Sequence, residues 1–136
     1  QSIDFFPTLA EMCGLDTPDL LDGVSFVSAL EGKPFERDTI FCHFPHYTPA
    51  AGGIPSTYVR KNDWKLIRFY CDSDDQSDRL ELYNLVEDIG ETNNLVETHP
   101  DRARELNALI DRFLDDAGAI VPEPNPIYQF EQANGD

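Results

Sequence analysis

The chain has few of the residues that build metal sites, redox sites and membrane spans. Its 136 residues include three cysteines and three histidines, and no two cysteines stand in a C-x-x-C pair. A zinc or redox site therefore has no support from residue spacing. No apolar run approaches the roughly 20 residues that a membrane-spanning helix needs. A starting methionine and a signal peptide are absent as well, which indicates a piece of a longer protein.

The three cysteines are expected to be small buried thiols. Cys42 and Cys71 both fall at strand-like positions, and they could form a disulfide only if the fold brought those positions close together. Cys13 falls at the end of an expected helix. The cysteine pattern thus predicts packing residues rather than a reactive site.

Positive charge is scarce in this chain. Lys and Arg number 10 against 26 Asp and Glu, so the net charge is −16. A surface of that sign repels phosphate backbones, which argues against nucleic-acid binding. Four of the basic residues nevertheless fall close together: Arg60, Lys61, Lys65 and Arg68. We interpret them as a solvated hairpin whose long side chains keep their charges in water; a local positive rim is the alternative.

Hydrophobic residues make up 40% of the chain, which is enough for a core and too many for a disordered tail. Asp4 is placed to cap a helix from Phe5 to about Cys13, and Gly14 is placed to end it. A second short helix is expected from Ser25 to Leu30. Polar residues from 33 to 38 then indicate a subdomain boundary.

Beyond this boundary the apolar residues recur with a period of two, which is typical of strands. The expected strands are Thr39–Phe44, Ser56–Lys61, Trp64–Tyr70 and Leu80–Leu85. Asn62 and Asp63 form a two-residue hairpin turn, and residues 48–55, rich in glycine and proline, form a loop. The sequence therefore predicts a four-stranded antiparallel sheet.

One helix is expected to cover this sheet. Thr98 is the expected N-cap, with Pro100 in the first turn. Gly118 ends the helix after about 18 residues, roughly 27 Å. Its apolar residues recur every three or four positions and form one stripe: Ala103, Leu106, Ile110, Phe113, Leu114 and Ala117. The proline-rich segment that follows is expected to be extended and to cross the surface as a strap.

The most informative stretch is E-L-Y-N-L-V-E-D-I-G-E-T-N-N-L, from Glu81 to Leu95. It couples a strand to a polar turn, and it resembles the E-L-Y-D-L-x-x-D-P-x-E-x-x-N-L segment near the carboxyl end of sulfatases. Asn84 and Ile89 replace the aspartate and the proline of that pattern. Gly90 can still supply the turn, because glycine readily adopts a positive φ.

Three further segments follow in the order that this family would give. D-F-F-P-T-L at residues 4–9 is similar to the start of a D-x-x-P-T-L helix, and L-D-G-V-S-F at residues 21–26 is similar to L-D-G-x-S-L. Arg60, followed by W-K-L-I at residues 64–67, resembles an R-x-x-x-(W/Y)-K-L-I hairpin. The resemblance covers about residues 1 to 126. By it, the chain is identified as the C-terminal portion of a sulfatase of the alkaline phosphatase-like superfamily.

The resemblance implies an α+β fold in two parts. Residues 1–35 would be the last helices of the catalytic α/β domain, and residues 36–136 a C-terminal subdomain with a small four-stranded antiparallel sheet and one packed helix. The parent would hydrolyse a sulfate ester of a small molecule or glycan. This portion would close the domain and contribute to the rim of the substrate cleft. Family habit implies a periplasmic or secreted location.

The resemblance also implies cofactors that this chain does not supply. Sulfatases use a formylglycine made from a C/S-x-P-S-R motif together with a calcium ion, and no segment here matches either set of residues. We therefore expect no catalytic and no metal-binding residue in this chain, and we expect both groups in the N-terminal catalytic domain of the same polypeptide. The acidic loop from Asp72 to Asp78 alternates like a calcium-binding EF-hand, but Ser77 replaces the required glycine and Tyr83 the bidentate glutamate. A solvated loop is expected there.

The remaining candidates are His43, His46 and Tyr47, at the end of the first strand and before the long loop. Side chains of these types could hydrogen-bond a sugar or an anion. From the residues alone, a histidine satisfied inside the fold is the simpler interpretation. The resemblance favours the other one, because sulfatases carry a similar H-(Y/F)-P-H-Y segment facing the cleft. These three residues are the predicted substrate-binding site.

Two other functions remain open. A phosphonate or phosphodiester hydrolase of the same superfamily would differ in its nucleophile motif. A non-catalytic acidic binding module would need no such motif. The sequence upstream of Gln1 separates the three functions, because the sulfatase hypothesis requires C/S-x-P-S-R there.

Overall fold

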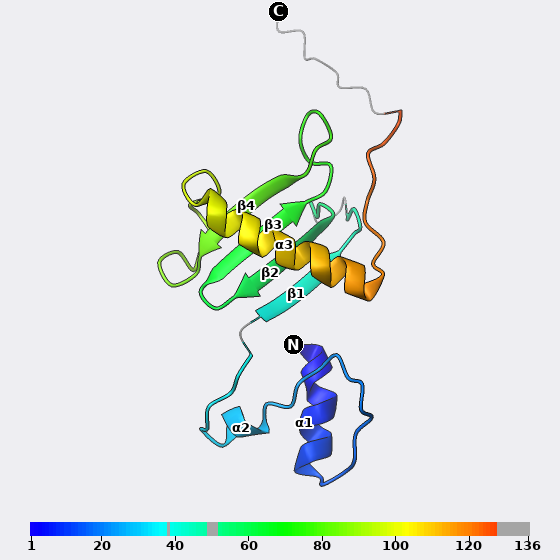
Figure 1. Ribbon diagram of the computed structural model, residues 1–136, viewed down its shortest axis with the longest axis vertical. Coiled ribbons are helices and arrows are strands. Elements are labelled where there is room, and N and C mark those ends of the chain that lie inside the picture. The colour runs from blue at the N-terminus through cyan, green and yellow to red at the C-terminus, as the bar shows by residue number, and fades with distance from the viewer. Residues whose placement is uncertain (38, 49–51, 128–136) are drawn as a thin grey trace, which may run out of the picture. The chain divides into compact units, whose positions relative to one another are not determined.

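The computed structural model describes residues 1–37, 39–48 and 52–127. The chain forms two compact units, Gln1–Arg37 and Asp38–Asp136 (Figure 1). The assignment of the first residues to a catalytic domain stays a prediction. Within the described ranges, no helix is both long and apolar enough to cross a membrane.

The first unit is a short helix held by a loop. A 3-10 turn, η1 (Ser2–Asp4), leads into α1 (Phe5–Met12), and α2 (Val27–Leu30) follows the loop. Gly14 has a φ of +66° and lies just after α1, as predicted. The helix α2 begins two residues later than predicted, because the Ser25 hydroxyl accepts the Val27 N–H (3.3 Å) from outside the helix.

The Asp4 side chain holds the loop rather than capping α1. Its carboxylate accepts the Val24 N–H (2.9 Å) and forms an ion pair with Arg37, and it makes no side-chain cap to the helix. Asp4 is thus the N-cap residue of α1, as predicted, but its side chain, only 3% exposed, bonds to the loop and not to the first turn of the helix. Burial alone would raise the pKa of Asp4, but hydrogen bonds from the Gln1 nitrogen, from Val24 and from Arg37 lower it below its ordinary value.

Gly23 and Thr8 explain two of the family-like segments at the start of the chain. A Cβ at Gly23 would lie 2.1 Å from the Ile3 carbonyl oxygen, so only glycine lets the loop pass η1 this closely. The Thr8 hydroxyl donates to the Asp4 carbonyl (2.6 Å) and accepts the Phe26 N–H (3.1 Å). Both residues therefore fasten the loop to the helix.

One side of α1 carries an uncovered apolar stripe. The buried residues of the helix are Pro7, Thr8 and Ala10. The α1 stripe consists of four apolar residues that are 56% to 62% exposed: Phe5, Phe6, Leu9 and Met12. At 3.6 residues per turn these positions lie within about 120° of the helix circumference. The first unit thus buries one side of its helix and leaves the more hydrophobic side in solvent.

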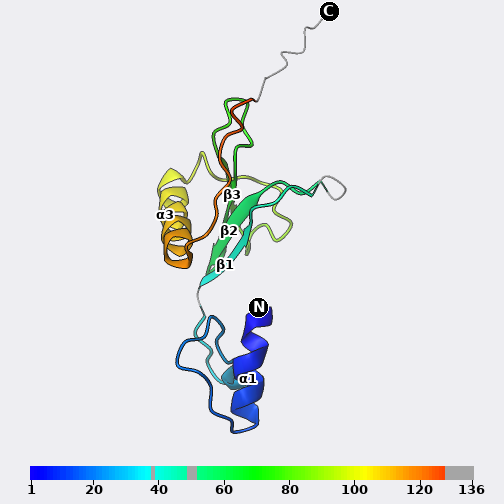
Figure 2. The ribbon, with the colours of Figure 1, turned by 90° about the vertical axis from the view of Figure 1, so that its right-hand side faces the viewer.

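The second unit is a four-stranded antiparallel sheet with a helix on one face (Figures 1 and 2). Its strands are β1 (Thr39–Phe44), β2 (Ser56–Lys61), β3 (Trp64–Phe69) and β4 (Arg79–Asn84), in that spatial order. The covering helix is α3 (Pro100–Ala117). The predicted sheet and C-terminal helix are confirmed. The turn at Asn62 and Asp63 is confirmed as well, with Asn62 at a φ of +53°.

The core lies between α3 and the facing side of the sheet. Phe41, Val59, Leu66 and Leu82 stand opposite one another across the four strands. The core cluster consists of Val59, Leu66, Leu82, Ala103, Leu106, Ile110 and Leu114, all buried. Phe113 stacks on Phe41 with ring centroids 4.5 Å apart. Of the predicted stripe, Ala117 is exposed, because it is the last residue of the helix.

The two ends of α3 differ in how well the sequence predicted them. Gly118 takes a left-handed conformation (φ +57°) and ends the helix as predicted. The N-cap, however, is His99 and not Thr98, since Pro100 is already the first helical residue. The Thr98 hydroxyl donates instead to the Leu95 carbonyl (3.1 Å), as part of the turn that precedes the helix.

Residues 119–127 run back from α3 along the sheet, toward the loop between β3 and β4 (Figure 2). The Ile120 carbonyl bonds to His43 of β1 (2.9 Å), and the Asn125 N–H donates to Gln76 of that loop (2.7 Å). These two anchors agree with the predicted strap over the described residues. The rest of the predicted tail, beyond residue 127, lies outside them.

The cysteines are not buried thiols, so that prediction is wrong. Cys13 and Cys42 are exposed, Cys71 is half-buried, and all three are free. Cys42 lies on the face of β1 that points away from α3, and Cys13 follows the last residue of α1, so neither has a covering element within its unit. Burial and the nearby Asp78 carboxylate raise the pKa of Cys71.

Candidate functional site

His43 lies on the helix-covered face of β1 and uses both ring nitrogens inside the second unit. Nδ1 is 2.7 Å from the Thr57 hydroxyl oxygen, and Nε2 is 2.9 Å from the Ile120 carbonyl oxygen. The Thr57 hydroxyl in turn bonds to the Tyr70 hydroxyl. We call this series of hydrogen bonds the His43 relay. It runs from Tyr70 through Thr57 and His43 to the Ile120 carbonyl.

The inner end of the relay is closed to solvent. Thr57 is 0% exposed and Tyr70 is 1% exposed. Burial raises the pKa of Tyr70, and its hydrogen bond with Thr57 only partly offsets that effect. The Tyr70 hydroxyl therefore keeps its proton at neutral pH and can donate it into the relay.

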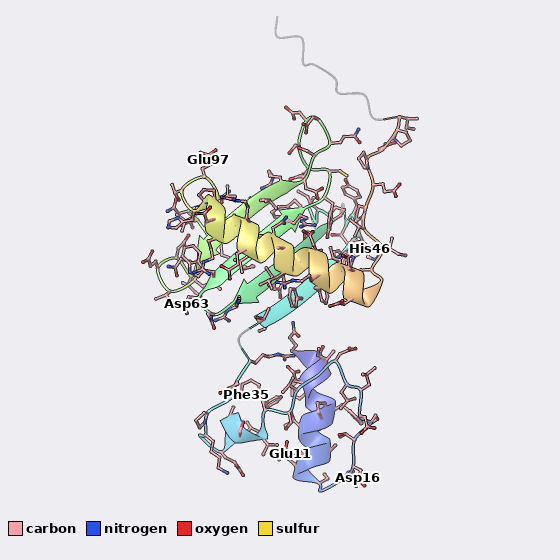
Figure 3. The ribbon with its side chains drawn as sticks, viewed as in Figure 1. Glu11, Asp16, Phe35, His46, Asp63 and Glu97 are labelled. Atoms are coloured by element: carbon pink, nitrogen blue, oxygen red, sulfur yellow. The ribbon has the colours of Figure 1, made fainter. Side chains whose placement is uncertain are left out.

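His46 and Tyr47 lie outside this network, just beyond the end of β1. Figure 3 labels His46. His46 is exposed, and Tyr47 is 67% exposed. The ring of His46 contacts the ring of Phe44, with centroids 5.4 Å apart. Thr48 and Gly53 then pair through their backbones (3.1 and 3.2 Å), which closes the following loop at its base. Residues 49–51 of the predicted loop lie outside the described ranges.

The predicted substrate-binding site is therefore divided. His43 points into the fold and is fully hydrogen-bonded there, whereas His46 and Tyr47 are accessible from solvent. A binding role for the three residues stays a prediction. Sequence reasoning missed Thr57 and Tyr70, whose inward position could have been found from the strand alternation that places Val59 and Leu66 in the core.

A second polar group lies beside the relay on the same face of the sheet. Arg68, the cross-strand partner of Thr57, is 9% exposed. It donates to Asn107 Oδ1 (2.6 and 2.9 Å) and to Asp111 Oδ1 (2.6 Å), both on α3. The guanidinium thus joins the helix to the sheet, where its hydrogen bonds compensate its burial.

The four clustered basic residues do not form a positive rim. Arg68 points inward, whereas Lys65 lies on the opposite face and binds Glu91 (2.7 Å). Lys61 reaches Glu105 (3.5 Å), and Arg60 donates to the Asn62 carbonyl (3.2 Å). The rim alternative is wrong, because strand alternation sends these side chains to two faces and three of them pair with carboxylates.

The family-like signature after β4 is a folded turn. The Asp88 carboxylate accepts the N–H groups of Asn93 (2.8 Å) and Thr92 (2.7 Å), and these bonds lower its pKa. Asn94 Oδ1 accepts the N–H groups of Leu82 and Val96, both at 3.0 Å. The aspartate and the asparagine of the signature therefore shape the loop and tie it to β4.

Glu91 completes this turn. Its carboxylate binds Lys65 Nζ (2.7 and 2.8 Å), and the same ammonium lies 5.0 Å from the centroid of the Tyr58 ring. Gly90 lies in the turn, as predicted, but the positive φ is at Glu91 (+54°) and not at Gly90, so that part of the prediction is wrong. The side-chain contacts of Asp88, Glu91 and Asn94 in the signature are thus all made within the fold.

Among the residues that the structure describes, no group of three or more His, Cys, Asp or Glu could hold a metal ion. The carboxylates of the acidic loop bond to donors of the chain itself. Asp78 accepts the Cys71 N–H (3.1 Å), Asp75 accepts the Ser77 N–H (2.9 Å), and Asp72 pairs with Arg79 (2.7 Å). This donor set does not fit the calcium ion that the resemblance implies for the parent.

Comparison with known proteins gives consistent matches. The family model described as N-sulphoglucosamine sulphohydrolase, C-terminal, matches residues 1–117. A sulfatase of Formosa agariphila is 36% identical over 109 residues, which cover 74% of this chain and 19% of that protein. An N-acetylglucosamine-6-O-sulfatase of Bacteroides thetaiotaomicron is 32% identical over 100 residues, which cover 70% of this chain and 17% of that protein. The chain thus spans about a fifth of the length of these curated relatives.

Solved structures share the fold. An enzyme in complex with its substrate D-glucosamine-2-N,6-O-disulfate matches with a TM-score of 0.68 and 27% identity, covering 85% of this chain and 24% of that chain. The phosphonate monoester hydrolase of Agrobacterium radiobacter matches with a TM-score of 0.54 and 26% identity, again covering 85% of this chain and 24% of that chain. In both cases the matching part is about a quarter of a larger protein.

Proposed function

We propose, from the premise that this chain belongs to the N-sulphoglucosamine sulphohydrolase C-terminal family, that its full-length parent hydrolyses sulfate esters of sugars. Membership of the family rests on a match over residues 1–117 and confirms the predicted C-terminal portion of a sulfatase. The observation that carries the proposal is the sequence identity of 36% and 32% to two sulfatases over most of this chain.

We propose a sulfated amino sugar, within a glycan or free, as the substrate class. One relative is named for N-acetylglucosamine 6-O-sulfate, and one related structure holds a sulfated glucosamine. The net charge of −16 on this chain would repel a sulfated glycan over most of its surface. Contacts from this chain would therefore be short-range hydrogen bonds at a few positions rather than a broad basic surface.

The nucleophile and the metal would be supplied upstream. A formylglycine would provide the attacking oxygen and a calcium ion would hold the sulfate, and we place both in the N-terminal catalytic domain of the same polypeptide. This chain would close that domain: residues 1–35 would belong to it, and residues 36–136 would form the subdomain beside it. The α1 stripe supports the first assignment, because four large apolar side chains at 56% to 62% exposure need a covering surface.

The second unit would contribute to the rim of the substrate cleft. His46 and Tyr47 carry the proposed contact, since both are exposed at the end of β1 and both can exchange hydrogen bonds with sugar hydroxyls or with sulfate oxygens. His43 supports them from inside. The signature from Asp88 to Asn94 keeps β4 and the following loop in shape and is assigned no substrate contact.

The test is an assay of the full-length parent. Release of inorganic sulfate from glucosamine 6-sulfate and from N-sulfoglucosamine is measured with and without a calcium chelator. The proposal expects turnover of at least one of them, lost on chelation, and no turnover by residues 1–136 alone. A parent that cleaves neither sulfated sugar nor an aryl sulfate would refute it, as would an upstream sequence without a C/S-x-P-S-R motif.

A phosphonate monoester hydrolase is the second candidate. The observation that favours it is the match to such an enzyme at 26% identity over 85% of this chain. The same assay separates the two functions when an aryl phosphonate monoester is added as a substrate. Faster cleavage of the phosphonate than of any sulfate ester would decide for this candidate.

A further inference from the structure

We propose that His43 is a positioning residue: the His43 relay fixes the end of β1 so that His46 and Tyr47 face the substrate. The proposal rests on the proposed function for its consequence in the enzyme, but its structural content can be measured on this chain alone. In this proposal His43 does not make the direct substrate contact that the sequence predicts, but acts through His46 and Tyr47.

The hydrogen-bond directions in the relay follow from its two ends. A carbonyl oxygen only accepts, so His43 Nε2 must carry the proton that lies toward Ile120. In the neutral ring Nδ1 then accepts, and the Thr57 hydroxyl donates to it. The Thr57 oxygen can accept in turn from the Tyr70 hydroxyl, which is protonated. Every donor in the His43 relay then points from Tyr70 toward Ile120. This arrangement selects the Nε2–H tautomer of neutral His43.

Burial makes the bonds at the inner end of the relay hard to replace. Thr57 and Tyr70 are 0% and 1% exposed, so water cannot take over a lost partner at the inner end. A buried donor or acceptor left without a partner is destabilising. The ring of His43 is therefore held from the inside, and rotation into solvent would leave Thr57 without its acceptor.

The relay also joins four different segments of the chain. His43 and Thr57 are cross-strand partners in β1 and β2, Tyr70 follows β3, and Ile120 lies beyond α3. The Ile120 segment is held a second time where Asn125 bonds to Gln76 (2.7 Å). His43 thus links the first strand of the sheet to a segment that is anchored at two points.

The exposed residues lie directly between two anchors. His46 and Tyr47 begin three residues after His43, and the backbone pair of Thr48 and Gly53 follows immediately. Pro45 restricts the backbone between them, because its ring fixes φ. With so short a segment held at both ends, the position of the His43 backbone sets the direction of the His46 and Tyr47 side chains.

The decisive experiment uses NMR on the 136-residue chain with three variants. Thr57→Val keeps the shape of the side chain and removes the hydroxyl, and Tyr70→Phe removes the donor at the inner end of the relay. His99→Ala is the matched control on a histidine outside the relay. We expect the Nε2–H tautomer for His43 and a slowly exchanging Hε2 proton. Thr57→Val should shift the resonances of His46 and Tyr47 and speed exchange of Hε2, Tyr70→Phe should do so less, and His99→Ala should do neither.

The consequence in the parent is tested by a double-mutant cycle. His43→Gln keeps a donor toward Ile120 and loses the acceptor for Thr57, and it should lower kcat/KM for a sulfated sugar roughly two- to tenfold, the range of one hydrogen bond. Combined with His46→Ala it should add little further loss, because a positioning residue acts through the residue it positions. A small aryl sulfate, which would not reach His46 or Tyr47, should lose less activity than the sulfated sugar in every variant.

Several outcomes would overturn the proposal. One is an Nδ1–H tautomer of His43, and another is unchanged His46 and Tyr47 resonances in Thr57→Val. A third is a double-mutant cycle in which the losses of kcat/KM from His43→Gln and His46→Ala add in full. An inactive parent would refute the proposed function only. In that case the NMR comparison still decides whether the relay positions the segment.

Discussion

The two units of this chain differ in how far they bury their apolar side chains. In the second unit α3 covers the sheet, and Leu66, Leu82, Leu106 and Ile110 are all 0% exposed. In the first unit α1 turns Phe5, Phe6, Leu9 and Met12 toward solvent. The difference teaches that only the second unit holds a core of its own. The first has a fastened loop and an exposed apolar surface.

The largest expected effect tests the core of the second unit. Ile110→Ala should lower the free energy of unfolding of this chain by about 2–5 kcal/mol, through lost burial and a residual cavity. The matched change in the first unit, Leu9→Ala, should leave it nearly unchanged, because Leu9 is 57% exposed. Urea denaturation of both variants checks this. Equal losses for the two would mean that the first unit also has a closed core.

A smaller loss is expected from the polar contact between α3 and the sheet. Arg68→Ala removes the hydrogen bonds to Asn107 and Asp111, and it should cost about 1.5–3 kcal/mol, typical of hydrogen bonds to a charged group. Asp111 is 56% exposed at its side chain, so its charge returns to water without a large penalty. The unfolding midpoint measures the effect, with Arg104→Ala, on the exposed side of α3, as the control. A loss no larger than that of the control would contradict the account.

A pH dependence is expected from the signature turn. The folded pKa of Asp88 lies below its ordinary value of 3.8, because Asn93 and Thr92 hydrogen-bond the carboxylate. Its contribution to stability is therefore fully present above about pH 4–5 and is lost as the pH falls through the folded pKa. Asp88→Asn should accordingly show a shallower fall in melting temperature from pH 5 to pH 2.5 than the unaltered chain. Parallel curves would show that Asp88 does not contribute in this way.

The smallest effect on stability is expected from the α1 stripe itself. Phe6→Ser should change the unfolding free energy of this chain by no more than about 0.5 kcal/mol, as for other exposed positions. It should nevertheless reduce binding of a hydrophobic dye and self-association at high concentration, because it shortens an exposed apolar patch. Glu11→Gln, a change on the other side of the helix, should alter neither. Strong destabilisation by Phe6→Ser would mean that the stripe is covered within the unit.

The features that the sequence predicted best are those that depend on residues close together in the chain. The strands and α3 follow from apolar residues that recur with periods of two and 3.6. Gly14 and Gly118 end their helices because the chain takes a left-handed φ at both positions. The failures came where a distant partner decides. The Asp4 side chain bonds to Val24, 20 residues away, instead of capping α1, and His43 is held by Ile120, 77 residues away. No local pattern contains those pairings, so the sequence could not show that His43 points inward while His46 and Tyr47 are exposed.

The central claim, that the second unit folds around its own core and the first depends on a partner, is tested most directly by amide hydrogen exchange. An eight-residue helix such as α1 is marginal without tertiary cover. In the chain alone we therefore expect strong protection in β2, β3 and α3 and weak protection in α1. In the full-length parent, α1 should gain protection comparable to α3, whether or not the parent shows sulfatase activity. Protection of α1 equal to that of α3 in the chain alone, or no gain in the parent, would contradict the account.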